Sequence, residues 1–236
     1  MPKIMTKDLI KVYRAGKSEV IALRGLDMQI ADGEAVAIQG PSGCGKTTLL
    51  NLIGGIDRPT AGRIEVDGTN IVDAADGDLV TYRRDKVGFV FQFFNLVPTL
   101  TAEENVQLPM QLAGIARERQ TRRASELLRL VGLQTRASHR PDELSGGEQQ
   151  RIAVAVALAN DPPLILADEP TGELDTKTGQ EILELFERLN RDLRKTVIIV
   201  THDDRVARIA NRILRIEDGK IVREIPRGAV VAADGS

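Results

Sequence analysis

The segment GPSGCGKT, residues 40–47, constrains the fold of this 236-residue chain more than any other feature. The apolar run EAVAIQ (34–39) before it predicts a β-strand, and KTTLLNLI (46–53) predicts a helix. The pattern G-x-x-x-x-G-K-[ST] between a strand and a helix is that of a phosphate-binding loop. A chance glycine-rich turn is the alternative, and it is expected in only about one per cent of chains of this composition. The sequence therefore predicts a site for a nucleoside triphosphate.

The residues of this loop have separate chemical tasks. Its glycines let successive backbone N–H groups point at phosphate oxygens, and the helix that follows adds its positive dipole end. The Lys46 ammonium is expected on the β- and γ-phosphates, and the Thr47 hydroxyl on Mg²⁺. Cys44 is expected to be a small spacer without a redox role. The residues predicted to bind the nucleotide are Gly40, Pro41, Ser42, Gly43, Cys44, Gly45, Lys46, Thr47 and Thr48.

Two carboxylates follow a second apolar run, LILA at 164–167. Ligands of α/β sheets bind at the carboxyl ends of the strands, so Asp168 and Glu169 are expected beside the phosphate loop. Asp168 is predicted to hold Mg²⁺ through its hydration shell, and Glu169 to polarise the attacking water. The alternative is that both residues cap the turn that follows.

Six motifs, taken together, resemble those of ATP-binding cassette (ABC) proteins. They are the signature LSGGEQQR (144–151), the Walker B segment LILADE (164–169), the D-loop GELD (172–175), the Q-loop residue Gln92, the switch residue His202, and Tyr13 where the family places an aromatic residue against adenine. The motifs occur in the family's order, and the resemblance covers about residues 3–225. A set of this kind is far more specific than any one of its members.

The resemblance implies an ATPase that powers export, extraction or force transmission through a separate membrane permease subunit. Its catalytic residues would be Lys46, Gln92, Glu169 and His202, with ATP and Mg²⁺ as cofactors and Gln92 also near the metal. For His202 the alternative is a satisfied core histidine. For Tyr13 the alternative is plain packing, because aromatic stacking leaves no local spacing signal.

The signature segment predicts a second anion site, because Ser145, Gly146, Gly147 and Glu148 open a helix whose first N–H groups are free. The resemblance implies that this helix end faces the γ-phosphate held by another copy. Two chains would then enclose two ATP molecules, which predicts a homodimer in the ATP-bound state.

The fold predicted from these elements is α/β: a P-loop NTPase core with a mostly parallel sheet, an antiparallel N-terminal β-subdomain and an inserted α-helical subdomain. The apolar period changes from strand to helix near residue 100 and back near 160. One domain is therefore expected over 1–225, with the core and β-subdomain at about 1–95 and 161–225 and the helical subdomain at about 96–160. A helical stripe is predicted from Ile182 to Leu193. Residues 226–236 are expected to form a flexible tail.

Segments 19–30, 83–110 and 170–182 resemble the group of lipoprotein-release, macrolide-export and cell-division ATPases. Members of that group serve small membrane subunits that have large extracytoplasmic domains. Val156 stands where the family commonly has an arginine, so the ion pair of that arginine is expected to be missing. Glu173 replaces the asparagine common in this group's D-loop, which adds negative charge near the expected dimer contact.

Charge and hydropathy argue against a nucleic-acid partner, a membrane-spanning segment and a signal peptide. A net charge of −2 offers no basic field for nucleic acid, so no nucleic-acid partner is expected. The longest uncharged stretch, 87–102, is interrupted by polar residues and is too short to span a bilayer. The N-terminus lacks the apolar region of a signal peptide. The expected location is cytoplasmic, peripheral on the cytoplasmic face of the cell membrane.

Other ATPase classes fit the sequence less well. A DNA-repair or chromosome-organising ATPase would carry a long coiled coil between Lys46 and Ser145, and a translation factor would carry two cassettes. A phosphate-loop GTPase would have an Asn-Lys-x-Asp motif. A nucleotide-gated scaffold without hydrolysis would not need both Glu169 and His202. These classes remain as alternatives to a transport ATPase.

The apolar segment 93–100 predicts a contact with the membrane subunit. Four of the five phenylalanines lie at 89, 91, 93 and 94, and strand alternation would send the first three to one face. Beyond Gln92 the sequence becomes irregular while it remains apolar, which predicts an exposed patch centred on Phe94 and Leu96. The alternative is that this loop folds back on the helical subdomain.

Overall fold

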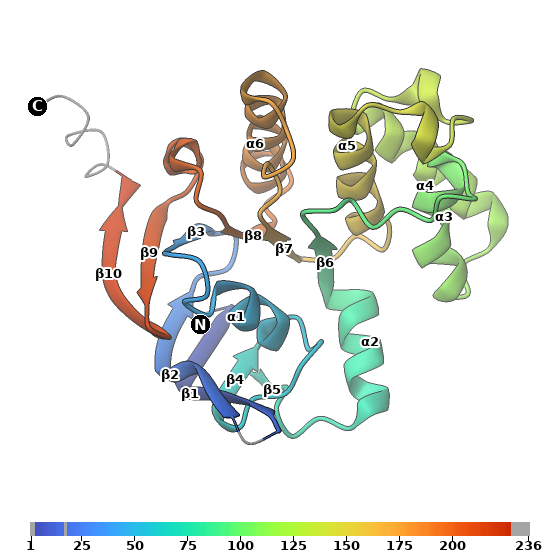
Figure 1. The fold of residues 1–236 in the computed structure, drawn as a ribbon. Coiled ribbons are helices and arrows are strands. Elements are labelled where there is room, and N and C mark those ends of the chain that lie inside the picture. The colour runs from blue at the N-terminus through green and yellow to red at the C-terminus, as the bar shows by residue number, and fades with distance from the viewer. Residues whose placement is uncertain (1–2, 17, 228–236) are drawn as a thin grey trace, which may run out of the picture.

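The structure, a computed structural model, describes residues 3–16 and 18–227 and contains two β-sheets flanked by helices (Figure 1). The strands are β1 (Ile4–Ala15), β2 (Ser18–Ile30), β3 (Ala35–Gln39), β4 (Ala61–Val66), β5 (Thr69–Asn70), β6 (Val87–Val90), β7 (Leu164–Asp168), β8 (Thr196–Val200), β9 (Arg212–Glu217) and β10 (Lys220–Pro226). The helices are α1 (Lys46–Ile53), α2 (Asp76–Lys86), α3 (Ala102–Leu112), α4 (Arg117–Leu130), α5 (Gly146–Ala157) and α6 (Thr176–Arg191). Short 3-10 helices cover Gln134–Arg136, Pro141–Glu143 and Asp204–Arg208.

The larger sheet has the strand order β10-β9-β3-β8-β7-β6, and every neighbouring pair except β9 and β10 runs parallel. Alternate residues of β7 serve two different cores. Ile165 and Ala167 belong to a core that includes α6, whereas Leu164 and Leu166 belong to one that includes α1. A strand covered on both faces needs apolar residues at every position, which explains the continuous apolar runs. The predicted mostly parallel core is confirmed.

The smaller sheet is antiparallel, with the order β2-β1-β4-β5. It packs beside α1, because Leu23, Leu26 and Ile64 join the same core as Leu49 and Leu50. This arrangement confirms the antiparallel N-terminal β-subdomain. It also holds α1, and with it the phosphate loop, from the side opposite to the parallel sheet.

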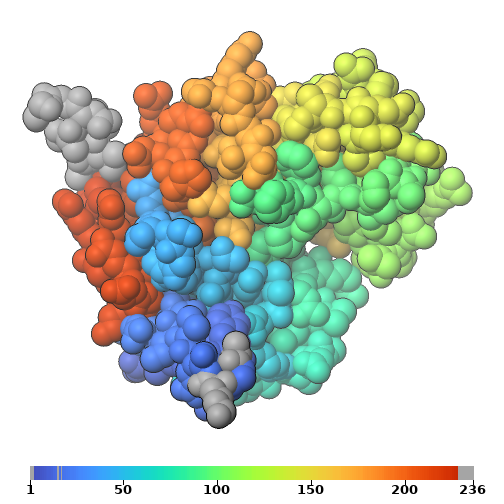
Figure 2. All heavy atoms as spheres, viewed as in Figure 1, coloured from blue at the N-terminus to red at the C-terminus, as the bar shows by residue number. Residues whose placement is uncertain are grey.

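Helices α3, α4 and α5 stand between β6 and β7 in the sequence, within residues 96–160. Figure 2 shows their green-to-yellow atoms gathered on one side of the molecule, next to the orange atoms of the α6 region. Helix α3 begins at a capping box in which the Thr101 hydroxyl and the Glu104 carboxylate bind each other's backbone N–H groups. Its sequence therefore fixes where the helical part starts.

Three details differ from the sequence prediction. Helix α2 is an additional element that the sequence does not predict, because Leu79 is its one buried residue and it shows no apolar period. The stripe predicted to reach Leu193 ends earlier: α6 stops at Arg191, and Leu193 is exposed. Strand β10 continues to Pro226, and the backbone N–H of Arg227 donates to the Asn211 carbonyl. The rest of the predicted tail, 228–236, lies outside the described residues.

Candidate functional site

The phosphate loop leads from β3 into α1 as an open helix N-terminus. Gly45 is the N-cap, with φ 102°, a left-handed conformation that glycine adopts without strain. No side chain caps this helix, and no acidic residue lies in its first turn. The first N–H groups of α1 are therefore not satisfied by any side-chain cap, which leaves them to an anion.

The side chain of Lys46 folds back into the loop. It is 9% exposed, and its Nζ donates to the carbonyl oxygens of Gly40 at 2.9 Å and Pro41 at 3.0 Å. Cys44 is buried beneath, with its Sγ 4.0 Å from Lys46 Nζ. A side chain at Gly40 has no room, since its Cβ would lie 2.1 Å from the Ile216 carbonyl oxygen. The loop is thus packed against the protein at Gly40 and Cys44 and open to solvent at Ser42 and Gly43.

Thr47 and Asp168 meet at the carboxyl edge of the parallel sheet. The Thr47 hydroxyl donates to Asp168 Oδ1 at 3.1 Å. Burial raises the pKa of Asp168, and the neighbouring Glu169 charge acts in the same direction, while Thr47 and Lys46 oppose the shift. A hydroxyl and a carboxylate are oxygen ligands of the kind that Mg²⁺ prefers.

The described residues contain no group of three or more His, Cys, Asp and Glu side chains arranged to hold a metal. Mg²⁺ at nucleotide sites is usually bound by one or two protein oxygens together with phosphate oxygens and water. Thr47 and Asp168 therefore fit a metal that arrives with the nucleotide, and they would not by themselves form a cage for it.

Glu169 and His202 form a pair at the ends of the neighbouring strands β7 and β8. Glu169 Oε2 lies 3.0 Å from His202 Nδ1 and accepts from the His202 backbone N–H at 3.3 Å. Glu169 has φ 46°, unusual for a residue with a side chain, and its backbone N–H donates to the Val200 carbonyl at 2.8 Å. The His202 side chain is 76% exposed, so the structure contradicts the alternative that it is a core histidine.

Gln92 follows the end of β6 and contacts the D-loop. Its Nε2 donates to Glu173 Oε1 at 2.9 Å. The parallel register pairs Val90 with Ala167, so a residue two positions beyond Val90 lies near the level of Glu169. The predicted Q-loop residue is therefore close to the carboxylate edge, but its partner in this structure is a residue to which the sequence assigned no catalytic role.

The signature segment begins α5 with its own cap. The Ser145 hydroxyl accepts from the Glu148 N–H, and Glu148 Oε2 accepts from the Ser145 N–H at 2.9 Å. Hydrogen bonds from Ser145 lower the pKa of Glu148, and Arg136 at 3.0 Å adds to the effect. Gly147 packs against Thr178, whose Cγ2 would lie 2.2 Å from a Cβ at that position. Within the described chain, no hydrogen bond joins this segment to the phosphate loop.

Tyr13 lies on β1 next to the phosphate loop. Its hydroxyl donates to Asp57 Oδ2 at 2.9 Å, and Lys11 Nζ lies 4.7 Å from its ring centroid. Burial raises the pKa of the Tyr13 hydroxyl, with Thr48 lowering it and Asp57 raising it further. Tyr13 is therefore held by Asp57 and Lys11, and it remains 40% exposed.

Sequence reasoning missed the residues that tie the switch segment to the D-loop. Asp203 accepts from the Thr171 hydroxyl at 3.2 Å and from Arg205 at 2.6 Å, and Arg205 also donates to the Thr176 carbonyl. Burial alone would raise the pKa of Asp203, but Arg205 and Thr171 lower it overall. The contacts with Thr171 and Thr176 join residues about 30 positions apart, which leaves no local pattern to detect.

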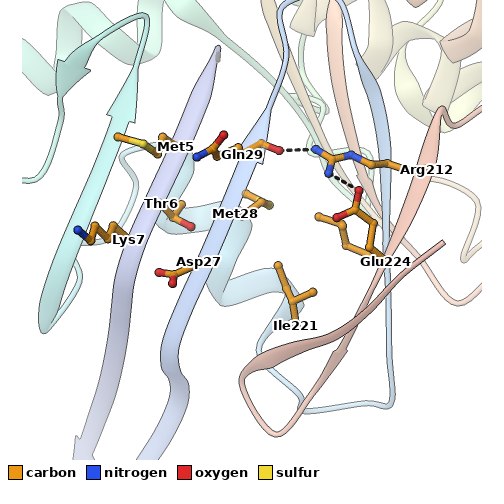
Figure 3. A pocket seen from close by; sticks show the side chains of 10 residues that line it. Met5, Thr6, Lys7, Asp27, Met28, Gln29, Arg212, Ile221 and Glu224 are labelled. Carbon is orange, nitrogen blue, oxygen red and sulfur yellow. Dashed lines mark hydrogen bonds and ion pairs between the residues drawn. The ribbon is translucent and has the colours of Figure 1, made fainter. Parts of the chain in front are cut away.

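A cleft of about 630 Å³ opens between the two sheets, away from the predicted site (Figure 3). Arg212 crosses it, in an ion pair with Glu224 at 2.7 Å and in a hydrogen bond to the Gln29 carbonyl. Met28 and Ile221 supply apolar lining. None of the residues that line this cleft belongs to the predicted nucleotide site, so ATP is not expected to bind in it.

Comparison with known proteins identifies what this geometry resembles. The sequence profile of the ABC transporter family matches residues 23–172, more than half of the chain. The lipoprotein-releasing system ATP-binding protein LolD of Geobacter metallireducens is 46% identical over 217 residues, which cover 92% of this chain and 96% of LolD. The macrolide export ATP-binding/permease protein MacB of Syntrophobacter fumaroxidans is 46% identical over 226 residues, or 95% of this chain and 32% of MacB.

A solved structure has the same fold. The ATP-binding cassette MJ0796, described as a dimer in a post-hydrolysis state bound to ADP and Pi, superimposes with a TM-score of 0.88 at 46% identity. The match covers 95% of this chain and 98% of that one. The predicted ABC ATPase fold is confirmed, as is the resemblance to the lipoprotein-release and macrolide-export group.

Proposed function

The chain belongs to the ABC transporter family of ATP-binding proteins and is an ATPase, and on this premise we propose how its residues work. Two copies bind two ATP–Mg²⁺ complexes between them, hydrolyse them, and drive export, extraction or force transmission through a separate membrane permease subunit. The contact between Glu169 and His202, next to Thr47 and Asp168, is the observation that carries this proposal.

Each residue has a role that follows from its contacts. The N–H groups of the loop and the Lys46 ammonium bind phosphate oxygens, since Lys46 exchanges its carbonyl partners for the stronger charge of a phosphate. Thr47 and Asp168 would hold Mg²⁺, which when bound neutralises developing phosphate charge. Glu169 orients the attacking water and accepts its proton, and His202 holds the γ-phosphate in place.

The Glu169–His202 contact explains how the base is positioned. The imidazole of His202 and the backbone N–H of His202 both contact one carboxylate oxygen of Glu169, Oε2. The other oxygen, Oε1, is left for water. The side chain of Glu169 is 18% exposed, so that its surroundings are drier than those of His202. A base held in this way needs little reorganisation before the water attacks.

Two substitutions test the assignment in different ways. Glu169→Gln keeps the size and hydrogen bonding of the side chain but loses the base, so ATP should bind while hydrolysis falls by about 10²–10⁴-fold. Lys46→Ala removes a charged phosphate contact and should weaken ATP binding itself by about 10–100-fold. Hydrolysis by Glu169→Gln near the rate of the unaltered chain would refute the role of Glu169.

The dimer has its own test. Ser145, Gly146 and Gly147 of each copy complete the site of the other, so Glu169→Gln should be monomeric without nucleotide and dimeric with ATP and Mg²⁺ in sedimentation velocity. Adding Ser145→Arg should prevent the dimer because it places bulk and a second cation at the composite site. An unchanged mass across all conditions would contradict the shared site.

In this proposal the membrane subunit docks on segment 93–100 and on a separate apolar groove, which no residue of that segment lines. Val80, Phe89, Leu112 and Val156 line a groove of about 390 Å³ between α2, α3 and α5. Leu112 is 78% exposed and Val80 54% exposed. Val156 adds apolar surface here at the position where the family has an arginine. An apolar helix end of the permease subunit fits this lining.

Segment 93–100 is largely exposed, as the sequence predicts, but the two residues predicted at its centre, Phe94 and Leu96, are half-buried. Leu96 packs against the core of the helical part, so this residue follows the fold-back alternative. Phe93 is 68% exposed, and the rings of Phe89 and Phe91 before it stack with their centroids 4.4 Å apart. The exposed apolar residues of the segment are therefore Phe93 and Val97, and Leu112 is the most exposed apolar residue that lines the groove.

Replacing Phe93 and Leu112 with serine tests the docking surface. The double variant should keep its melting temperature and ATP binding but lose co-purification with the membrane subunit. Leu96→Ser is the matched control, since it should lower the melting temperature by removing a packed side chain. Retained assembly in the folded double variant would place the contact elsewhere.

The proposed location follows from this assembly. No helix among the described residues is long and apolar enough to cross a membrane. We propose that the chain lies on the cytoplasmic face of the cell membrane, held there by the permease subunit, and that it has no nucleic-acid partner. Fractionation should find it with membranes when the permease subunit is present and in the soluble fraction when that subunit is deleted.

A further inference from the structure

The amide of Gln92 has a partner whose chemistry fixes its orientation. Gln92 Nε2 donates to Glu173 Oε1 at 2.9 Å, across 81 positions of sequence. Within the described part of the chain no hydrogen bond reaches Gln92 Oε1. An ionised carboxylate accepts hydrogen bonds and cannot donate one, so only the NH₂ end of the amide can face Glu173. The opposite end, Oε1, is thereby turned away from the D-loop.

The backbone around Glu173 supports this arrangement. Gly172 donates its N–H to the Glu169 carbonyl at 3.0 Å, which closes a short turn that starts at the proposed base. A Cβ at Gly172 would lie 3.3 Å from Gln92 Nε2 and 3.5 Å from its Cδ, so the amide rests directly on this turn. The position of Gln92 is therefore set by the same turn that carries Glu169.

The strand register brings the amide to the metal edge. Strands β6 and β7 run parallel, with Val90 opposite Ala167, and Asp168 is the last residue of β7. Gln92 lies two residues beyond Val90, at the edge where Asp168 accepts the hydroxyl of Thr47. A side chain that offers an oxygen at this edge has a cation as its natural partner.

We propose that Glu173 is a positioning residue for Gln92: it holds the amide nitrogen so that the amide oxygen faces the Mg²⁺ that accompanies ATP. The proposal rests on the function proposed above and gives a role to a D-loop residue that is not among the proposed catalytic residues. An asparagine or glutamine at position 173 would pair with either end of the Gln92 amide and would not select one. Glu173 is exposed, so its substitution is compatible with folding.

Metal affinity, measured without turnover, tests the proposal. The Glu169→Gln chain is mixed with ATP, and the binding of Mn²⁺ in place of Mg²⁺ is followed by the loss of the free-ion signal in electron paramagnetic resonance. Adding Glu173→Gln should weaken Mn²⁺ binding by about twofold, because an amide at position 173 pairs with either end of Gln92 and leaves its oxygen correctly oriented only about half of the time. Glu173→Asp should give an intermediate affinity.

A matched control is available on the exposed face of α6. Gln180 Nε2 donates to Glu184 Oε1 at 3.1 Å, which is the same type of pair with the same charge. Glu184→Gln should leave Mn²⁺ affinity unchanged. Equal affinities for Glu173→Gln and Glu184→Gln would overturn the proposal.

Variants that also carry Gln92→Ala separate two effects of Glu173: the orientation of the Gln92 amide and the negative charge near the metal. With Gln92→Ala present, Glu173→Gln should no longer alter Mn²⁺ binding, because there is no amide left to orient. Gln92→Met, which keeps the length of the side chain, serves if Gln92→Ala does not fold. A loss that persists without the amide would assign the effect to the negative charge alone and would also overturn the proposal.

Binding of a fluorescent ATP analogue, measured without metal, tests the proposed nucleotide site separately from the positioning role of Glu173. If the analogue does not bind to the unaltered chain, the proposed function fails and the positioning role fails with it. If the analogue binds and the Mn²⁺ affinities still do not differ, the positioning role alone is wrong.

Discussion

Among the described residues, two helices begin at glycine-rich segments, and their N-termini are capped differently. At α1 the N-cap is Gly45, with no capping side chain and no acidic residue in the first turn. At α5 the N-cap is Ser145, which forms a complete capping box with Glu148. No side chain caps the first helix, so a bound anion would supply the hydrogen-bond acceptors for its free N–H groups. At the second, Ser145 satisfies the Glu148 N–H within the chain, while no hydrogen-bond partner of the Gly146 and Gly147 N–H groups occurs in the described residues.

The difference indicates separate duties for the two ends. An uncapped N-terminus costs stability when empty and gains it when an anion binds, so the phosphate loop couples folding to nucleotide. A capped N-terminus keeps its conformation when no partner is bound. That property suits a surface which is completed only when two copies meet, as we propose for Ser145 and Gly147.

The largest effect is expected from Gly45→Ala. The new Cβ would lie 2.4 Å from the Ala22 carbonyl oxygen, at a φ of 102° that L-residues rarely adopt. The strain should cost about 1–3 kcal/mol, and ATP binding should be lost because the loop amides shift. Chemical denaturation and nucleotide titration measure the two effects.

Gly43→Ala is the matched control for Gly45→Ala. Gly43 also has a positive φ, 79°, but a Cβ at this position would meet no other described atom within 4 Å. It should therefore show the conformational cost without the clash. Equal losses at the two positions would mean that φ alone governs the loop and that the approach of Ala22 is unimportant.

How far the sequence predicts this site depends on the range of the contacts. Lys46, Thr47 and Ser145 can be identified because their motifs are continuous, and the register of β6, β7 and β8 then brings Gln92, Glu169 and His202 to one edge.

Contacts between distant segments could not be predicted in this way. The bonds of Gln92 to Glu173 and of Tyr13 to Asp57 join distant loops, and they depend on packing that no local period encodes. The same holds for α2, which lacks an apolar stripe, and for Leu96, whose partial burial agrees with the alternative that the sequence left open.

The next largest effect is expected from Gly147→Ala in the capped helix start. Its Cβ would lie 2.2 Å from Thr178 Cγ2, a side-chain atom, so α5 and α6 must move apart slightly. The cost should be about 1–3 kcal/mol in the free energy of unfolding. ATP binding to the single chain should persist, since the phosphate loop is untouched.

A second substitution can rescue this variant. Thr178→Ser removes Cγ2 but keeps the hydroxyl that donates to Asp175 at 2.5 Å, so it should restore most of the stability. Gly146→Ala is the control, because its Cβ would lie 3.6 Å from Leu174 and Phe94, an ordinary contact. If Thr178→Ser fails to rescue Gly147→Ala, the contact between α5 and α6 does not limit this position.

A smaller effect is expected from Ser145→Ala. It removes the hydroxyl that accepts from the Glu148 N–H and should cost about 1 kcal/mol, as usual for an N-cap. Thermal melts with and without ATP test the comparison directly. The loss should be the same in both conditions for the isolated chain, whereas a loss that ATP reverses would mean that α5 binds nucleotide within one copy.

The smallest effect is expected from pH, through Glu148. Hydrogen bonds from Ser145 lower the pKa of Glu148, so its carboxylate stabilises the fold while ionised. This contribution is fully present above the unfolded pKa of about 4.3 and is lost as the pH falls through the lower folded value. The difference in melting temperature between the unaltered chain and Glu148→Gln should therefore be constant from pH 7 to pH 5 and shrink below about pH 4. The uncapped start of α1 has no first-turn carboxylate, so no corresponding loss arises there. A difference that grows on acidification would mean that Glu148 is held by its protonated form and that the capping box is not ionic.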